Sequence, residues 1–115
     1  MTALTHLRFL AFHAQKHRCC YCSLTMWLAS PAEIQAIGLQ SRSAALLRCT
    51  AEHLVAKQDG GKNVAGNIAA ACWYCNTHRH KRKTAPAPDA YRTFVERRKA
   101  KGKWNSFLIA PLRNT

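Results

Sequence analysis

Two C-x-x-C pairs, Cys19–Cys22 and Cys72–Cys75, constrain the fold of this chain more than any other feature of its sequence. Each pair can place two thiolates on one ion at about 2.3 Å, and two pairs complete a tetrahedral zinc site. Single free cysteines are more often small buried hydrophobic residues, which is our interpretation of Cys20 and Cys49. Cys20 is also a register alternative to Cys19. The sequence therefore predicts a structural Zn²⁺ held by four cysteines.

The composition favours this metal site over disulfide bonds. At 115 residues, with 48% hydrophobic and 20% charged residues, the chain is expected to be a single globular domain, residues 1–115. We see no secretory signal and no run of roughly 18 apolar residues that would span a membrane. We therefore expect a reducing cytoplasm, in a bacterial or phage-type setting, and no membrane partner.

The charge distribution indicates a polyanionic partner. Eighteen Lys and Arg against five Asp and Glu give a formal net charge of +13, and residues 79–103 hold ten of the basic and two of the acidic residues. Such a field attracts phosphate backbones, so nucleic acid is the leading expected partner. The specific partner that we expect is double-stranded DNA. The alternative is a generally solvated basic surface, or one that meets ribosomal RNA or acidic lipid. The residues expected to contact phosphates are Arg79, Lys81, Arg82, Lys83, Arg97, Arg98 and Lys99.

The residue pattern predicts an α+β domain with mostly helical flanks. Apolar residues at three- and four-residue intervals indicate an N-terminal helix over about residues 3–17. Ser30-Pro31-Ala32-Glu33 has the form of a capping box and should begin a short helix inside a helical insertion, residues 23–48. After the insertion begins, we expect a turn at 41–47, a strand at 48–56 and a loop that contains Gly60 and Gly61. A helix at 69–83 and a connector at 84–88 should follow. The last expected element is a basic C-terminal helix from Asp89 to Ala100, which lies within a basic segment, residues 89–103.

The helix expected over residues 69–83, which contains the second cysteine pair, can carry a second set of ligands. At about 100° per residue, Asn76 and His80 lie one turn apart on the same face, next to the flank that holds Cys72 and Cys75. His78 points nearly opposite to His80, and we interpret it as exposed or phosphate-contacting. Trp73, between two presumed zinc ligands, is expected in the core.

The motif C-x-x-C, E-H-L, G-G-x-N, N-I, C-x-x-C-N and R-H resembles the HNH endonuclease family over residues 19–83, apart from the insertion. The resemblance implies the ββα-metal fold in its four-cysteine, zinc-bearing form. It also implies that His53 is the general base, that Asn67 orients this base, and that Glu52 and Asn76 bind the catalytic cation. His80 falls where some members have a further histidine ligand, although a phosphate contact is an equal alternative.

These residue types suit phosphodiester hydrolysis. A neutral imidazole can take a proton from water at physiological pH. A hard cation, Mg²⁺ or Mn²⁺, prefers oxygen ligands such as those of Glu52 and Asn76 and can offset the charge on a leaving oxygen. Singly, His53 fits a core histidine equally well, and Glu52 fits a salt-bridge partner of an arginine.

We therefore expect a metal-dependent DNA endonuclease with a His general base and one divalent cation. Two alternatives stay open. The first is a non-catalytic, zinc-containing module that only binds nucleic acid, and the second is a bacteriocin-like nuclease toxin with an acidic inhibitor. The sequence does not identify a target sequence, an oligomeric state or a role for the insertion.

Overall fold

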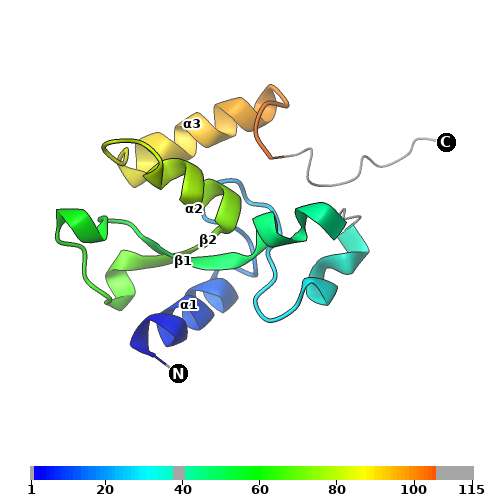
Figure 1. Ribbon diagram of the computed structural model, residues 1–115, viewed down its shortest axis with the longest axis horizontal. Helices are drawn as coiled ribbons and strands as arrows, with labels where there is room; N and C mark the ends of the chain where they lie inside the picture. The colour runs from blue at the N-terminus through cyan, green and yellow to red at the C-terminus, as the bar shows by residue number, and fades with distance from the viewer. Residues whose placement is uncertain (1, 38–40, 106–115) are drawn as a thin grey trace.

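A two-stranded antiparallel ribbon forms the centre of the molecule, with helices on both of its faces (Figure 1). The computed structural model describes residues 2–37 and 41–105. Helix α1 (Ala3–Ala14) packs against one side of the ribbon, whereas α2 (Trp73–His80) packs against the other side and is followed by α3 (Pro88–Ala100). This arrangement of helices and strands confirms the predicted α+β class and is compatible with a ββα fold.

Helix α1 is shorter than the predicted 3–17. The Thr2 hydroxyl caps it by accepting the Thr5 N–H at 3.1 Å. It ends because Lys16 and His17 adopt positive φ angles of 56° and 69°, which turn the chain toward the first cysteine pair. A side chain one turn from its end, Phe12, is buried against the core.

The ribbon consists of β1 (Cys49–His53) and β2 (Ile68–Cys72), with Cys49 opposite Cys72 and His53 opposite Ile68. The predicted helix at 69–83 is therefore wrong in its first third, where Ala69, Ala70 and Ala71 are strand residues. Alanine is an intrinsic helix former, but ribbon pairing and packing override this preference. Ala70 and Ala71 are fully buried, and the side chain of Gln15, the residue after α1, bonds both backbone groups of Ala70, at 2.8 and 2.9 Å.

The loop between the strands is ordered by two short 3₁₀ turns, η3 (Lys57–Asp59) and η4 (Ala65–Asn67). Gly60 takes a positive φ of 90°, as a loop glycine can. Gly61 is required for a different reason, because a Cβ at this position would collide with the carbonyl oxygen of Val55. The glycine pair therefore shapes the loop that returns the chain to β2.

The segment between the first cysteine pair and β1 contains 3₁₀ helices rather than α-helices, η1 (Pro31–Ile37) and η2 (Ser41–Leu47). The capping box is present in part. Glu33 accepts three backbone N–H groups, from Leu28, Ala29 and Ser30, whereas the Ser30 hydroxyl accepts from Ala32. The backbone N–H of Cys49 bonds the Trp27 carbonyl at 2.8 Å, which ties this segment to the edge of β1.

Helix α3 begins one residue before its predicted start, at Pro88, and Asp89 is not its cap. Ala87 occupies the cap position and makes no side-chain capping bond, while Asp89 lies in the first turn. The predicted apolar side is correct, since Tyr91 and Val95 are buried and Phe94 packs on the core. In the described part of the chain, no helix is long and apolar enough to cross a membrane.

Candidate functional site

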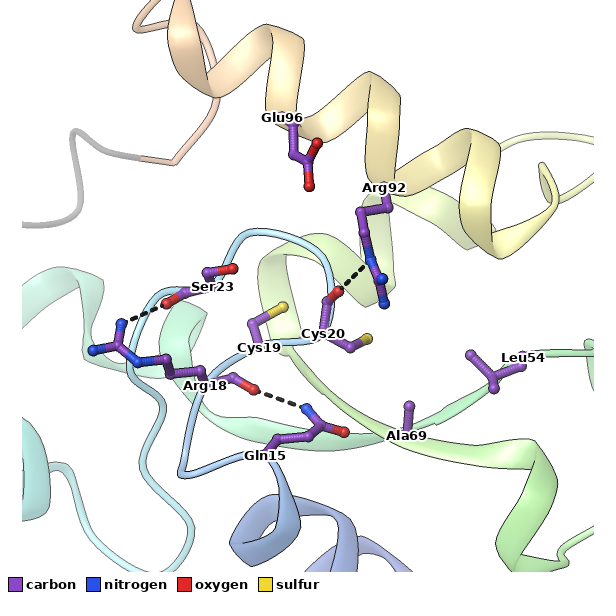
Figure 2. Close-up of a pocket in the computed structure, with 9 residues that line it drawn as sticks. All are labelled: Gln15, Arg18, Cys19, Cys20, Ser23, Leu54, Ala69, Arg92 and Glu96. Carbon is purple, nitrogen blue, oxygen red and sulfur yellow. Dashed lines mark hydrogen bonds between the residues drawn. The ribbon is translucent and has the colours of Figure 1, made fainter.

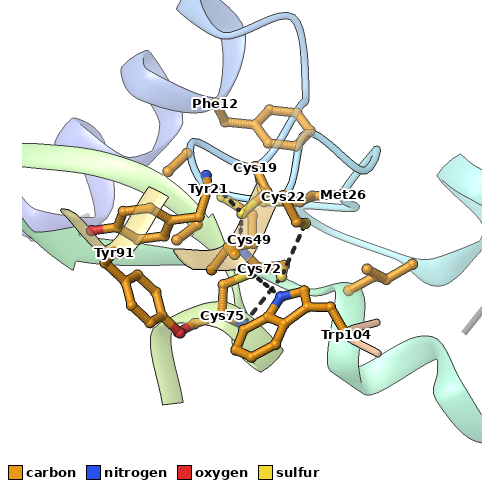
Figure 3. Packing of buried hydrophobic residues seen from close by; sticks show 14 of the residues in the cluster. Phe12, Cys19, Tyr21, Cys22, Met26, Cys49, Cys72, Cys75, Tyr91 and Trp104 are labelled. Carbon is orange, nitrogen blue, oxygen red and sulfur yellow. Dashed lines mark hydrogen bonds between the residues drawn. The ribbon is translucent and has the colours of Figure 1, made fainter. Parts of the chain in front are cut away.

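The four predicted zinc ligands come together in the core, between the turn after α1 and the junction of β2 with α2. The sulfur atoms of Cys19, Cys22, Cys72 and Cys75 all lie within 4.8 Å of one another, and all four residues are buried. Figure 3 shows them beside Tyr91 and the Trp104 indole. This set of four thiols could hold a metal ion, and four sulfur ligands suit tetrahedral Zn²⁺.

The environment of the cluster favours negative charge on the Cys19 sulfur. Burial raises the pKa of the Cys19 thiol, but hydrogen bonds from the neighbouring thiols outweigh burial and hold this pKa well below its ordinary value. The same hydrogen bonds to Cys19 raise the pKa of Cys72 and Cys75. Backbone N–H groups of Tyr21 and Cys72 also point at the Cys19 sulfur, at 3.4 and 3.3 Å.

The two remaining cysteines lie outside the cluster, as expected. Cys49 is buried on β1, and burial raises the pKa of its thiol to about 12. The turn that carries the first cysteine pair, residues 19–22, is called the knuckle below. Cys20 lines a pocket of about 500 Å³ between this knuckle and α3, where Arg92 donates to the Cys20 carbonyl at 3.0 Å (Figure 2). Cys19 rather than Cys20 therefore joins the cluster.

A second cluster of polar side chains lies between β1 and α2. Glu52 is fully buried, and its Oε1 lies 2.8 Å from Nε2 of His80 and 3.3 Å from a guanidinium nitrogen of Arg79. Asn76 donates through Nδ2 to the Thr50 hydroxyl at 2.9 Å and to the Ala51 carbonyl at 3.3 Å. The helix thus brings Asn76 and His80 to the strand that carries Glu52, as the spacing on α2 predicted.

His53 takes part in a different set of contacts. Adjacent strand residues project to opposite sides of a ribbon. Among the described residues, no hydrogen bond or ion pair joins the His53 ring to Glu52, Asn76 or His80. Instead, Nε2 of His53 lies 2.8 Å from Oδ1 of Asn63. An amide oxygen accepts, so Nε2 carries the proton and Nδ1 holds the lone pair.

Asn67 makes no direct hydrogen bond to the His53 side chain among the described residues, and its role in orienting the base stays a prediction. Its side chain accepts the Val55 N–H at 2.8 Å and donates to the carbonyls of Val55 and Lys62, both at 3.1 Å. It therefore closes the loop that carries Asn63, and Asn63 contacts the histidine. The sequence reasoning missed Asn63, although its position in G-G-x-N was visible.

Arg79 is a buried structural residue, not the phosphate contact that we expected. It is 2% exposed, and it donates to the carbonyls of Pro86, His53 and Leu54 at 2.9–3.0 Å besides its contact with Glu52. Lys99 is also engaged internally, because its Nζ lies 2.6 Å from the Cys22 carbonyl. The other residues expected to contact phosphates are exposed: Lys81, Arg82, Lys83, Arg97 and Arg98.

Two further interpretations of α2 need correction. His78 is half-buried rather than exposed, because its ring stacks on Tyr74 with centroids 4.1 Å apart and its Nδ1 bonds the Tyr74 carbonyl at 2.8 Å, whereas the alternative of a phosphate contact stays a prediction. Trp73 is not in the core, since 37% of it is exposed at the start of the helix. Trp104, which had no assigned role, is the buried tryptophan beside the thiol cluster.

One of the comparisons with known proteins found a match within this chain. Residues 41–82 match the family model described as HNH endonuclease, which confirms the resemblance read from the motif. The matched segment contains both strands, α2, the polar cluster around Glu52 and the second cysteine pair, whereas the first pair lies outside it. No curated protein and no solved structure matches the chain.

Proposed function

We propose that this protein is a metal-dependent endonuclease that cleaves the phosphodiester backbone of DNA. The observation that supports this best is the convergence of Glu52, Asn76 and His80 between β1 and α2, with His53 next in the chain, inside the segment that matches HNH endonucleases. HNH proteins typically act on nucleic acid, and the exposed basic residues suit a phosphate backbone.

The polar cluster fits a hard divalent cation such as Mg²⁺ or Mn²⁺. The Oε2 atom of Glu52 is buried with no hydrogen-bond partner among the described residues, so it is an acceptor that a cation can satisfy. Asn76 donates through Nδ2, which leaves its Oδ1 as an oxygen ligand. Nε2 of His80 would complete the proposed ligand set if the cation replaces the proton that this atom shares with Oε1 of Glu52. The bound cation offsets negative charge on the leaving oxygen.

His53 is the proposed general base. Because its Nε2–H is donated to Asn63, Nδ1 can accept a proton from the attacking water. Arg79 donates to the carbonyls of His53 and Leu54, which fixes the backbone at the end of β1, where His53 is the last residue. The proposed structural ion is Zn²⁺ on Cys19, Cys22, Cys72 and Cys75, because four thiolates leave no position for a substrate.

The second candidate is the non-catalytic nucleic-acid-binding module. The observation that favours it is that Glu52 is fully buried and paired with Arg79, as a purely structural carboxylate would be. This candidate predicts salt-sensitive DNA binding without cleavage under any divalent ion.

Incubation of supercoiled plasmid with the full chain and Mg²⁺ or Mn²⁺ separates the two candidates. We expect nicked or linear products, abolished by a chelator and reduced at least about a hundredfold by His53→Ala. The control is His6→Ala, which removes an exposed histidine of α1 and should cleave as the unaltered chain does. Glu52→Ala is a poor choice, since it would leave Arg79 as an unpaired buried charge. Equal cleavage by the His53 and His6 variants would contradict the assignment.

A further inference from the structure

We infer that Trp104 and Asn105, together with two cations of α3, belong to the metal site and offset the negative charge of its four thiolates. This inference rests on the proposed four-cysteine zinc site. It assigns a function to a segment that lies beyond the matched residues 41–82.

The first support is direct contact with sulfur. The Trp104 indole N–H donates to the Cys75 sulfur, with Nε1 at 3.2 Å, and the Asn105 amide nitrogen lies 3.9 Å from the Cys72 sulfur. Trp104 is 6% exposed and Asn105 is fully buried. Figure 3 shows the indole nitrogen turned toward the cysteine cluster rather than toward solvent. Two side-chain N–H donors from one dipeptide therefore face two of the four thiols.

The second support is the placement of positive charge around the first cysteine pair. Lys99 and Arg92 project from α3 onto the knuckle and donate to the carbonyls of Cys22 and Cys20, at 2.6 and 3.0 Å. Both cations thus lie on the turn that carries Cys19 and Cys22. They fasten α3 to this turn and add positive potential next to it.

Such groups are needed because of the net charge of the metal ion and its four ligands. Four thiolates around one divalent cation have a net negative charge, and a buried net charge is unfavourable unless hydrogen bonds or opposite charges compensate it. Groups that surround metal ligands typically change metal affinity by about 10–100-fold. Backbone N–H groups of Tyr21, Cys72 and Cys75 supply part of this compensation. Trp104, Asn105, Lys99 and Arg92 supply the rest.

Ring packing alone does not explain why a tryptophan, with its N–H donor, stands at position 104. The Trp104 ring also contacts the rings of Tyr74, Tyr91 and Phe94, at centroid distances of 5.1, 6.2 and 5.7 Å. A phenylalanine would preserve most of these ring contacts and remove the N–H donor. Trp104→Phe therefore separates the hydrogen bond from the packing.

The test measures metal binding and needs no nuclease activity. The full chain, Trp104→Phe and a control, Trp27→Phe, are titrated with Co²⁺ and then with Zn²⁺ in competition with a chromophoric chelator. The control removes an indole N–H that donates to the Ala44 carbonyl at 2.6 Å and not to a sulfur atom. Lys99→Gln and its neighbour on α3, Arg97→Gln, form a second matched pair, because Lys99 is tied to the knuckle and Arg97 is exposed.

We expect Trp104→Phe to bind Zn²⁺ at least about tenfold more weakly than the unaltered chain. Its sulfur-to-cobalt charge-transfer band should move to longer wavelength, because a hydrogen bond lowers the energy of the sulfur lone pair. Trp27→Phe should change neither property. Lys99→Gln should weaken Zn²⁺ binding a few-fold without moving the band, since Lys99 contacts a carbonyl, and Arg97→Gln should have no effect.

Unchanged affinity and an unchanged band in Trp104→Phe would overturn the inference. Equal losses in the two tryptophan variants would also overturn it, because they would indicate general destabilisation. If Trp104→Phe does not fold, the lysine pair decides, and equal affinity of the Lys99 and Arg97 variants counts against the inference. If the unaltered chain binds neither metal, the proposed zinc site itself fails.

Discussion

At the scale of single residues, burial separates cations that look alike in the sequence. Arg79 is one of seven basic residues that we grouped as phosphate contacts, yet it is 2% exposed and bonds three backbone carbonyls. Its partner Glu52 is one of five acidic residues and is fully buried. The pair connects the end of β1 to α2 and to the connector before α3. The carboxylate proposed to bind a cation is therefore also a structural anchor.

Arg79→Met should destabilise the fold by about 3–5 kcal/mol, because it leaves the Glu52 carboxylate buried without its cation and three carbonyls without their donor. Urea unfolding measures this change in the free energy of unfolding. Arg97→Met, which alters an exposed arginine of α3, is the control and should stay within about 0.5 kcal/mol. Similar losses in both variants would show that Arg79 is not an internal anchor.

At the scale of elements, local sequence preference and tertiary contact compete in β2. The fold class, the helix that carries Asn76 and His80, and the meeting of the cysteine pairs could be predicted, because each depends on spacing along the chain. Strand β2 could not, because three consecutive alanines favour a helix until β1 and Gln15 satisfy their backbone groups. The Asn63 contact was missed for a related reason, since loop closure by Asn67 sets it.

The 3₁₀ segment η1 offers a test by pH. Three backbone N–H groups, the first from Leu28, hold the pKa of Glu33 below its ordinary value, although burial opposes them. A lowered folded-state pKa means that the carboxylate stabilises the fold above its unfolded-state pKa and loses this effect as pH falls through the folded-state pKa. Because Glu33 is exposed, solvent screening keeps the effect to about 1 kcal/mol or less.

We therefore expect Glu33→Gln to unfold at lower urea concentration than the unaltered chain at pH 7. The difference should shrink as pH falls below the ordinary range of a glutamate. Taking the difference between the two proteins cancels the acid sensitivity of the thiol cluster. A difference that stays constant with pH would mean that the charge of Glu33 contributes nothing.

At the scale of the whole molecule, the thiol cluster joins segments that are far apart in the sequence. The first cysteine pair follows α1 and the second pair joins β2 to α2, while α3 and its tail cover both through Lys99 and Trp104. The polar cluster around Glu52 depends on the same β1–α2 packing. An ion held by these four sulfur atoms, as proposed, would position the elements that carry the proposed catalytic residues. Of the basic residues expected to contact phosphates, Lys81, Arg82, Lys83, Arg97 and Arg98 are exposed.

The proposal that a sulfur-bound zinc ion holds this fold together is tested by the metal content of the purified full chain, measured with its near-ultraviolet circular dichroism before and after chelation. We expect one zinc per chain. Chelation should remove both the ion and the aromatic signal, and added zinc should restore them. Cys72→Ser should show the same loss without chelator. A chain that keeps its full aromatic signal with no bound metal would show that no sulfur-bound ion is needed for the fold.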